Sequence, residues 1–228
     1  MSHRHKVLLR IASEIREHMS ADVTFVGIDG IDGAGKTCFA DELAEYLTDV
    51  EVIRSSVDGF HNPRALRYAK GRDSPQGFYP DSFNYTLLKR ELLDPLRSEN
   101  SWHYRTSVFD HRTDSPVMSP VREATPPTAL LFDGIFLHRP ELARYWHYSV
   151  FLDVNRRESL RRCNARAGFP DRSDDPEDPA HHRYVEGQRL YVSSCDPAAL
   201  ATRVINNDDL TKPYVVAQRT AGTTKGAA

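Results

Sequence analysis

Apolar residues along the chain recur in two different periods, which predict helices alternating with buried strands. Residues 5–19 carry Leu8, Ile11, Ile15 and Met19 at spacings of three and four, a pattern typical of an amphipathic helix. Short runs rich in β-branched residues predict five strands, at residues 23–29, 50–57, 128–133, 147–153 and 203–206. Further helices are predicted after residue 36, around 88–96, over 156–167 and over 180–193. This alternation predicts an α/β fold with a mainly parallel five-stranded sheet and helices on both faces.

Three segments depart from this periodicity. Residues 58–82 are polar and rich in glycine, proline and arginine, and we expect a loop there. Residues 101–110 alternate between apolar and polar side chains, which predicts a half-exposed strand or a hairpin-like insertion. Residues 217–228 are expected to form a disordered tail, so that residues 1–216 make up a single domain.

The composition narrows the classes of partner. With 228 residues, of which 39% are hydrophobic, the chain suits one domain with a sizeable core. The formal net charge of −2 gives no general attraction to nucleic acid, and no apolar run approaches the roughly 20 residues that span a bilayer. The three cysteines, Cys38, Cys163 and Cys195, lie far apart and are expected to be free thiols. These features predict a cytoplasmic protein without nucleic-acid or membrane partners, and they leave open whether it forms a homo-oligomer.

The most specific motif lies between the first predicted strand and the helix that follows it. Residues 30–37 read Gly-Ile-Asp-Gly-Ala-Gly-Lys-Thr and satisfy the P-loop pattern. Glycines let the backbone curl so that its N–H groups point at phosphate oxygens, and the lysine adds a cation. The motif predicts a P-loop NTPase fold whose ATP-binding residues are Gly30, Asp32, Gly33, Ala34, Gly35, Lys36, Thr37 and Cys38. For Cys38, just inside the helix, a small buried side chain is the simpler interpretation.

Polar residues stand at the predicted strand ends, where ligands of parallel sheets bind: Asp29, Asp58, Asp133, Asp153 and Asn206. Asp58 ends the second strand, a position from which a carboxylate could accept the proton of a hydroxyl that attacks the γ-phosphate. A turn residue before glycine is the alternative interpretation of Asp58. Asp133 ends the apolar run Leu130-Leu131-Phe132 and is expected to hold Mg²⁺ together with the Thr37 hydroxyl.

Arginines are the expected counter-charges for the transferred phosphoryl group. Arg162 and Arg166 lie four residues apart on a predicted helix that runs into a loose acidic segment. We expect residues 160–178 to form a lid that closes over the phosphates, with Lys36, Asp58, Arg162 and Arg166 as the catalytic residues. A solvated basic helix face is the alternative.

Together these motifs resemble the uridine kinase-like family of P-loop nucleoside kinases. The resemblance runs from about residue 23 to 207 and includes Val57-Asp58-Gly59-Phe60-His61, Phe109-Asp110-His111-Arg112 and Leu131-Phe132-Asp133-Gly134-Ile135. It implies that Asp58 is the acceptor base and that the acceptor contacts Asp58, His61, Tyr79, Phe109 and Arg112. His61 stands where the family usually has tyrosine, and Asp133 where uridine kinases usually have glutamate.

The predicted function is therefore transfer of the γ-phosphoryl group of ATP to a hydroxyl of a nucleoside, uridine or cytidine first. Kinases of pantothenate, pentose phosphates and ribosyl pyridines share the scaffold, and the basic residues Arg64, Arg67, Lys70 and Arg72 favour such a charged acceptor. A nucleotide-binding switch ATPase is a third hypothesis, which needs no base at Asp58. Asn206 and Asn207 are expected near the adenine, and the choice between ATP and GTP stays open.

Overall fold

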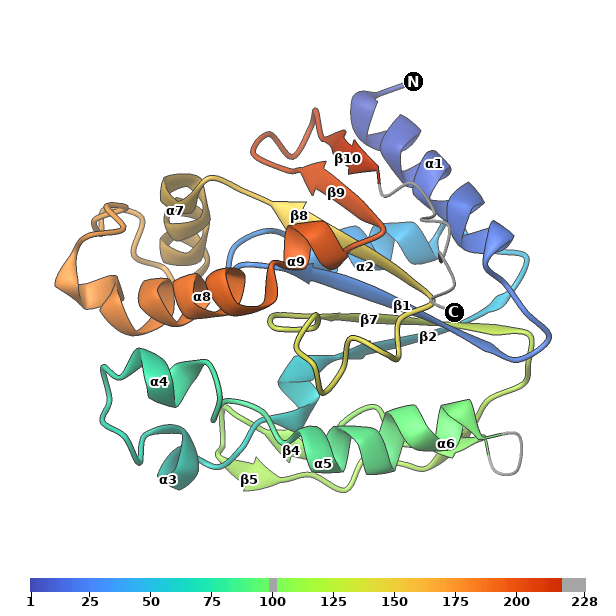
Figure 1. The fold of residues 1–228 in the computed structure, drawn as a ribbon, viewed down its shortest axis with the longest axis horizontal. Helices are drawn as coiled ribbons and strands as arrows, with labels where there is room; N and C mark the ends of the chain where they lie inside the picture. Colours follow the sequence, from blue (N-terminus) through green and yellow to red (C-terminus); the bar gives the residue numbers. More distant parts are fainter. Residues whose placement is uncertain (99–101, 219–228) are drawn as a thin grey trace, which may run out of the picture.

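The computed structural model describes residues 1–98 and 102–218 and is built around one twisted sheet (Figure 1). The strands lie in the order β10-β9-β8-β1-β7-β2. Their bounds are Val23–Gly30 for β1, Glu51–Ser56 for β2, Thr128–Gly134 for β7, Tyr148–Asp153 for β8, Arg203–Asn206 for β9 and Tyr214–Gln218 for β10. Strands β1, β2, β7, β8 and β9 pair in parallel, at the predicted places. Strand β10 pairs antiparallel to β9 at the edge of the sheet.

The predicted strand count was therefore wrong by one. In strand β10, Val215 is half-buried between the exposed Tyr214 and Val216, so these positions lack the continuous burial that marks the central parallel strands. Ala217 and Gln218 belong to this strand and not to the predicted tail, and the remainder of that tail, 219–228, lies outside the described residues.

Strand β1 lies at the centre of the sheet, and all eight of its residues are buried. It pairs with β7 on one side, where Asp29 is opposite Gly134, and with β8 on the other, where Gly30 is opposite Leu152. The chain that leaves β1 thus enters the crevice between two neighbouring strand ends, which is where open parallel sheets bind ligands.

Helices cover both faces of the sheet. Helices α1 (His3–Glu17) and α2 (Lys36–Ala44) bury an apolar cluster against one face that includes Ile11, Phe39 and Leu43. The opposite face is covered by α5 (Tyr85–Leu88), η2 (Lys89–Leu93) and α6 (Asp94–Arg97), whose Leu88, Leu92 and Leu96 are buried. In Figure 1, α1 lies above the sheet and α5 and α6 below it. None of the described helices is long and apolar enough to cross a bilayer.

The helix over 85–97 continues through Pro95 and has Ser98 as its C-cap. Pro95 has no N–H to donate, and the turn before it is a π-helix. The Glu91 carbonyl instead accepts a hydrogen bond from the Arg105 backbone N–H at 2.8 Å. The helix therefore passes the proline because another segment supplies the missing donor.

The segments predicted as loop and hairpin differ from expectation. Residues 58–82 contain the 3₁₀ turn η1 (Val57–Phe60) and two short helices, α3 (Arg64–Arg67) and α4 (Pro75–Phe78). In the described part of the predicted hairpin, 102–110, the strands are only two residues long, and they pair with later segments. These are β3 (His103–Tyr104) with β6 (Arg122–Glu123) and β4 (Phe109–Asp110) with β5 (Ser115–Pro116).

Helices α7 (Arg156–Arg166) and α8 (His182–Cys195) lie at the end of the sheet where the parallel strands have their carboxyl termini (Figure 1). Between them the chain forms a loop and the 3₁₀ turn η3 (Pro179–His181), and a short helix α9 (Pro197–Leu200) leads to β9. Arg183 of α8 donates to the carbonyls of Arg67, Gly71, Arg72 and Ser74. One buried guanidinium thereby fixes the 64–75 segment to α8.

The contact between α4 and α8 leaves no room for a side chain at Gly187. A Cβ atom there would lie 2.6 Å from Cδ1 of the buried Phe78 ring. Alanine normally stabilises a helix relative to glycine by about 1 kcal/mol. We nevertheless expect Gly187→Ala to lower the free energy of unfolding by about 1–3 kcal/mol, because overpacking outweighs that gain. Denaturant unfolding measures the change.

Ser193→Ala, at an exposed position of the same helix, is the control and should change stability by less than about 0.5 kcal/mol. A Gly187→Ala protein as stable as the wild type would contradict the close packing of α4 on α8.

Candidate functional site

The P-loop adopts backbone conformations that glycine permits. Gly33 and Gly35 have φ values of 71° and 87°, and Gly35 is the N-cap residue of α2. A Cβ atom on Gly33 would lie 2.3 Å from the Ser159 carbonyl oxygen of α7. The loop is therefore pressed against α7 at Gly33, and the motif needs glycine there for both conformation and space.

Side chains outside the P-loop donate hydrogen bonds to its backbone carbonyls. The Ala34 carbonyl accepts from Asn207 Nδ2 at 2.8 Å, the Asp32 carbonyl accepts from the Ser159 hydroxyl, and the Gly33 carbonyl accepts from Arg162 Nη1 at 3.4 Å. Three consecutive carbonyls are thus satisfied by residues of α7 and of the turn after β9. This arrangement holds the loop in shape before any ligand binds.

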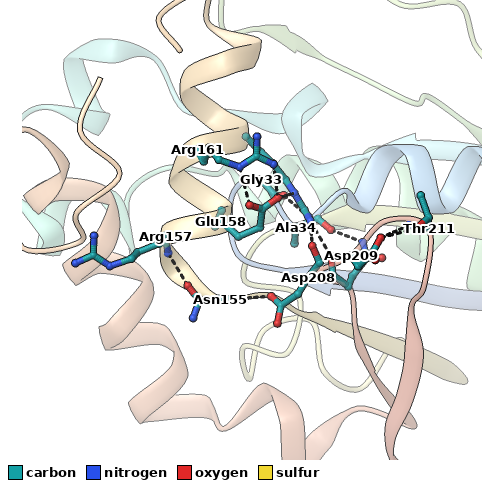
Figure 2. A network of polar contacts seen from close by, with 12 residues as sticks. Gly33, Ala34, Asn155, Arg157, Glu158, Arg161, Asp208, Asp209 and Thr211 are labelled. Atoms are coloured by element: carbon teal, nitrogen blue, oxygen red, sulfur yellow. Dashed lines mark hydrogen bonds and ion pairs between the residues drawn. The ribbon is translucent and has the colours of Figure 1, made fainter. Parts of the chain in front are cut away.

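Figure 2 shows the polar network that joins α7 to the turn after β9. Asp208 accepts from the backbone N–H of Asn155 at 2.6 Å, and Glu158 accepts from Arg161 and Arg162. Arg162 also donates to the Asn207 and Asp208 carbonyls. Its donors are thereby used within the fold, and it lines neither of the two cavities described below. The structure thus gives Arg162 contacts that fix the loop, and its predicted contact with the phosphoryl group stays a prediction.

A cavity of about 130 Å³ lies inside the P-loop. The residues that line it come from the loop, from the ends of β2 and β7 and from α7, and they include Asp32, Lys36, Thr37, Asp58, Asp133 and Arg166. Gly33, Gly35 and Cys38 also line it, whereas Gly30 and Ala34 do not. Cys38 is exposed, so the simpler interpretation of a buried side chain was wrong.

Asp133 and Thr37 form the part of the cavity that suits a divalent cation. Thr37 Oγ1 donates to Asp133 Oδ2 at 2.8 Å, and the other carboxylate oxygen accepts from Arg54 Nη2 at 2.9 Å. Mg²⁺ prefers hard oxygen ligands and is commonly held by one or two protein oxygens together with substrate phosphates and water. The two oxygens fit that role. Arg54, which the sequence did not single out, orients the carboxylate that supplies one of them.

Asp58 lies in η1, directly after β2, and is exposed to solvent. Its backbone N–H donates to Ser56 Oγ at 3.4 Å and its carbonyl lies 3.0 Å from His61 Nδ1. Its carboxylate makes no hydrogen bond or ion pair to another residue of the described ranges. The backbone of Asp58 is thus fixed while its carboxylate stays available to a ligand.

Asp32 and Lys36 set the charge at the centre of the cavity. Burial raises the pKa of Asp32. The nearby Lys36 cation opposes this increase, and the Asp58 carboxylate adds to it. Gln188 of α8 donates to Asp32 Oδ2 at 2.9 Å, and Lys36 Nζ donates to the Ile31 carbonyl at 2.8 Å. Lys36 therefore lies folded back on the loop, within reach of a phosphate in the cavity.

A larger cavity of about 760 Å³ lies between α7, the segment 167–181 and α8. Asp32 and Arg166 line both cavities, so the two adjoin. Arg166 is exposed and, apart from a 3.8 Å contact with Cys163 Sγ, its guanidinium has no partner among the described residues. Of the two predicted lid arginines, the structure thus brings Arg166 to the cavities.

The structure does not bring the other predicted acceptor contacts to either cavity. His61 packs between Phe83 and His111, with ring centroids 4.6 Å apart in both pairs, and burial lowers its pKa. The hydroxyl of Tyr79 lies 3.1 Å from Cys195 Sγ. Phe109 is buried in β4, and Arg112 is exposed with its carbonyl bonded to Arg64. Their contact with an acceptor stays a prediction.

A buried polar cluster behind the P-loop escaped the sequence motifs. Asp29, the last polar residue of β1 before the loop, accepts from the backbone N–H groups of Gly30, Leu137 and His138. It also accepts from His138 Nδ1 at 2.7 Å and from the Tyr191 hydroxyl of α8. Only the strand-end position of Asp29 was visible in the sequence, because its partners come from distant segments without a shared pattern.

Comparison with known proteins supports the same fold. No family model matches the chain. The curated uridine kinase of Ligilactobacillus salivarius (strain UCC118) is 21% identical over 183 residues, which cover 75% of this chain and 84% of that protein. A solved structure of a possible uridine kinase from Bacillus stearothermophilus has a TM-score of 0.68 at 21% identity and covers 87% of this chain and 97% of its own.

A candidate fructose transport system kinase from Silicibacter sp. TM1040 has a TM-score of 0.65 at 21% identity and covers 82% of this chain and 94% of its own. In sequence the chain is thus similar, at 21% identity, to a uridine kinase, and it shares the fold of the solved structures. The predicted fold class is thereby confirmed, and the predicted assignment as a small-molecule kinase agrees with these similarities.

The close approach of Gly33 to α7 makes nucleotide binding sensitive to one methyl group. We expect Gly33→Ala to weaken ATP binding at least about tenfold, because the loop must move away from the Ser159 carbonyl and lose its fitted shape. Isothermal titration calorimetry measures the affinity. Gly71→Ala is the matched control, since Gly71 also has a positive φ, of 102°, but no atom within 4 Å of the added Cβ. Equal ATP affinity of the two variants would contradict this account of the loop.

Proposed function

We propose that the chain transfers the γ-phosphoryl group of ATP to a hydroxyl group of a small molecule, with Asp58 as the base. One observation carries the proposal. The Asp58 carboxylate, free of protein partners, lines the same small cavity as Lys36, Thr37 and Asp133 of the phosphate site. A kinase whose acceptor is already a phosphate would not need a carboxylate in that position.

On the donor side, the P-loop backbone and Lys36 bind the phosphates of ATP. Thr37 and Asp133 would hold Mg²⁺, which would neutralise charge on the phosphates when bound. Arg54 keeps one oxygen of Asp133 occupied and the other directed at Thr37. The protein groups therefore fix the direction of the γ-phosphate before the acceptor enters.

On the acceptor side, Asp58 accepts the hydroxyl proton and orients the oxygen for in-line attack. Arg166 lies across the cavity on α7 and adds positive charge where negative charge spreads over the transferred group. Its side chain is exposed and its segment leads into the 167–181 loop, so small movements of α7 could bring it onto the phosphates.

Two acceptor classes have support. The names of the relatives, uridine kinases, favour a nucleoside such as uridine or cytidine. Arginines in the larger cavity favour an acceptor with a negative charge, of the pantothenate or pentose phosphate kind. Three of the four basic residues of 64–72 do not support that second class, since Arg67 pairs with Asp114, Lys70 pairs with Asp81 and Arg64 donates to the Arg112 carbonyl. A switch ATPase is a third hypothesis, which would use the phosphate cavity but explains neither the Asp58 carboxylate there nor the larger cavity.

Replacement of Asp58 tests the proposed base. We expect Asp58→Asn to lower kcat for acceptor-dependent ADP release by about 10²–10⁴-fold, because the amide cannot accept the hydroxyl proton. ATP affinity should stay within about twofold, since the P-loop is untouched. A coupled assay with ATP and Mg²⁺ against uridine, cytidine, pantothenate and pentose phosphates measures both acceptor choice and the effect of the variant.

Asp73→Asn, at an exposed position of the same segment, is the control and should leave kcat unchanged. Slow ATP hydrolysis that responds neither to any acceptor nor to Asp58→Asn would overturn the proposal and favour the switch hypothesis.

A further inference from the structure

The larger cavity contains a guanidinium without a protein partner. Arg156, the first residue of α7, lines this cavity, and its Nη1 atom is buried without a hydrogen-bond partner. A buried unpaired polar nitrogen destabilises the fold, and more strongly when it is charged. Native folds satisfy most such groups, so an orphaned one at a cavity wall points to a ligand.

The acidic residues nearest to Arg156 are already paired. Glu177 and Glu186 both form ion pairs with Arg189. Burial lowers the pKa of Arg156 and the neighbouring Arg189 cation lowers it further, whereas Glu186 and Glu177 raise it from a distance. Arg156 is therefore a positive group without a direct partner of its own. No carboxylate among the described residues forms an ion pair with it.

Two further arginines line the same cavity. Arg166 contacts only Cys163, and Arg172 lies over the Phe169 ring at 4.3 Å from its centroid, with no carboxylate partner in the described chain. The acids of the wall are engaged elsewhere. Asp178 accepts from the Ala180 backbone N–H at 2.9 Å, and Asp32 is bound by Gln188 and faces Lys36. The charged groups of the wall that lack a carboxylate partner among the described residues are thus arginines.

We propose that the acceptor carries an anionic group, a phosphate or a carboxylate, which binds Arg156 in the cavity between α7 and α8. This inference rests on the proposed function and names the substrate class of the same site. Arg172 adds positive charge to the same cavity from the loop that follows α7. Guanidinium groups suit both oxyanions, because their donors match two oxygens at once.

The position of the cavity agrees with that class of acceptor. Because Asp32 and Arg166 line both cavities, a molecule whose hydroxyl lies at Asp58 can extend past Asp32 into the larger space. Its volume of about 760 Å³ is that of a small-molecule pocket. A neutral nucleoside would leave Arg156 without a partner, whereas an anionic acceptor would satisfy it.

Binding measurements test the anion site separately from phosphoryl transfer. The full chain is loaded with ADP and Mg²⁺, which fill the P-loop, and is titrated calorimetrically with matched pairs of probes. The pairs are ribose 5-phosphate with ribose, for phosphate, and glycerate with glycerol, for carboxylate. We expect at least one anionic probe to bind about tenfold or more tightly than its neutral partner.

Variants assign that binding to Arg156. Arg156→Gln should weaken the anionic probe about 10- to 100-fold, the loss expected for a charged hydrogen bond, and Arg156→Lys should weaken it less because the charge remains. Arg161→Gln is the matched control, since Arg161 is exposed on the same helix and pairs with Glu158. It should leave the affinity unchanged. Circular dichroism confirms that each variant is folded.

The inference is overturned if neither anionic probe binds better than its neutral partner, or if Arg156→Gln binds the anion as tightly as the wild type. Its failure is distinct from failure of the proposed function. Uridine-stimulated ADP release that depends on Asp58 but not on Arg156 would retain the kinase and remove the anion site. Anion binding that depends on Arg156, without acceptor-dependent ADP release, would retain the anion site and remove the proposed kinase activity.

Discussion

The arrangement of the site depends on one buried carboxylate. Asp29 accepts from His138, from the Tyr191 hydroxyl of α8 and from the backbone of Gly30, the first residue of the P-loop. An acidic group without exposure to water is costly to bury unless donors surround it, so these partners must come together for the fold to form. The start of the P-loop, the turn after β7 and α8 thereby take fixed positions relative to one another.

Helix α8 carries this constraint to the rest of the site. Beyond Tyr191, which binds Asp29, its Gln188 donates to Asp32 of the P-loop, and its Arg183 holds the 64–75 segment through backbone carbonyls. Tyr184 lines the larger cavity from the same helix. The phosphate site, the acceptor side and the segment that follows Asp58 are therefore all attached to one rigid element, which explains how separate parts of the chain keep a common geometry.

Patterns within short stretches of sequence predicted the parts of the fold that local forces decide. The parallel strands and the P-loop were found in this way because continuous apolar runs and fixed glycine spacing are local signals. Contacts between distant segments decided what was missed. Strand β10 depends on pairing with β9, and the helix passes Pro95 because Arg105 satisfies the freed carbonyl. The four-residue spacing placed Arg162 and Arg166 on one face of the helix. The sequence did not show that, of the two, Arg162 binds the turn at Asn207.

The state of each arginine separates structural from functional roles where sequence cannot. Arg54 and Arg183 are bound by carboxylates or backbone carbonyls, so their donors are spent on fixing the fold. Arg156, Arg166 and Arg172 lie around one cavity with donors that no acidic side chain of the described residues occupies. Positive groups that lack direct ion pairs repel one another, and an anionic ligand that neutralises them stabilises the fold. The same physical rule that makes the first group a scaffold makes the second group a binding site.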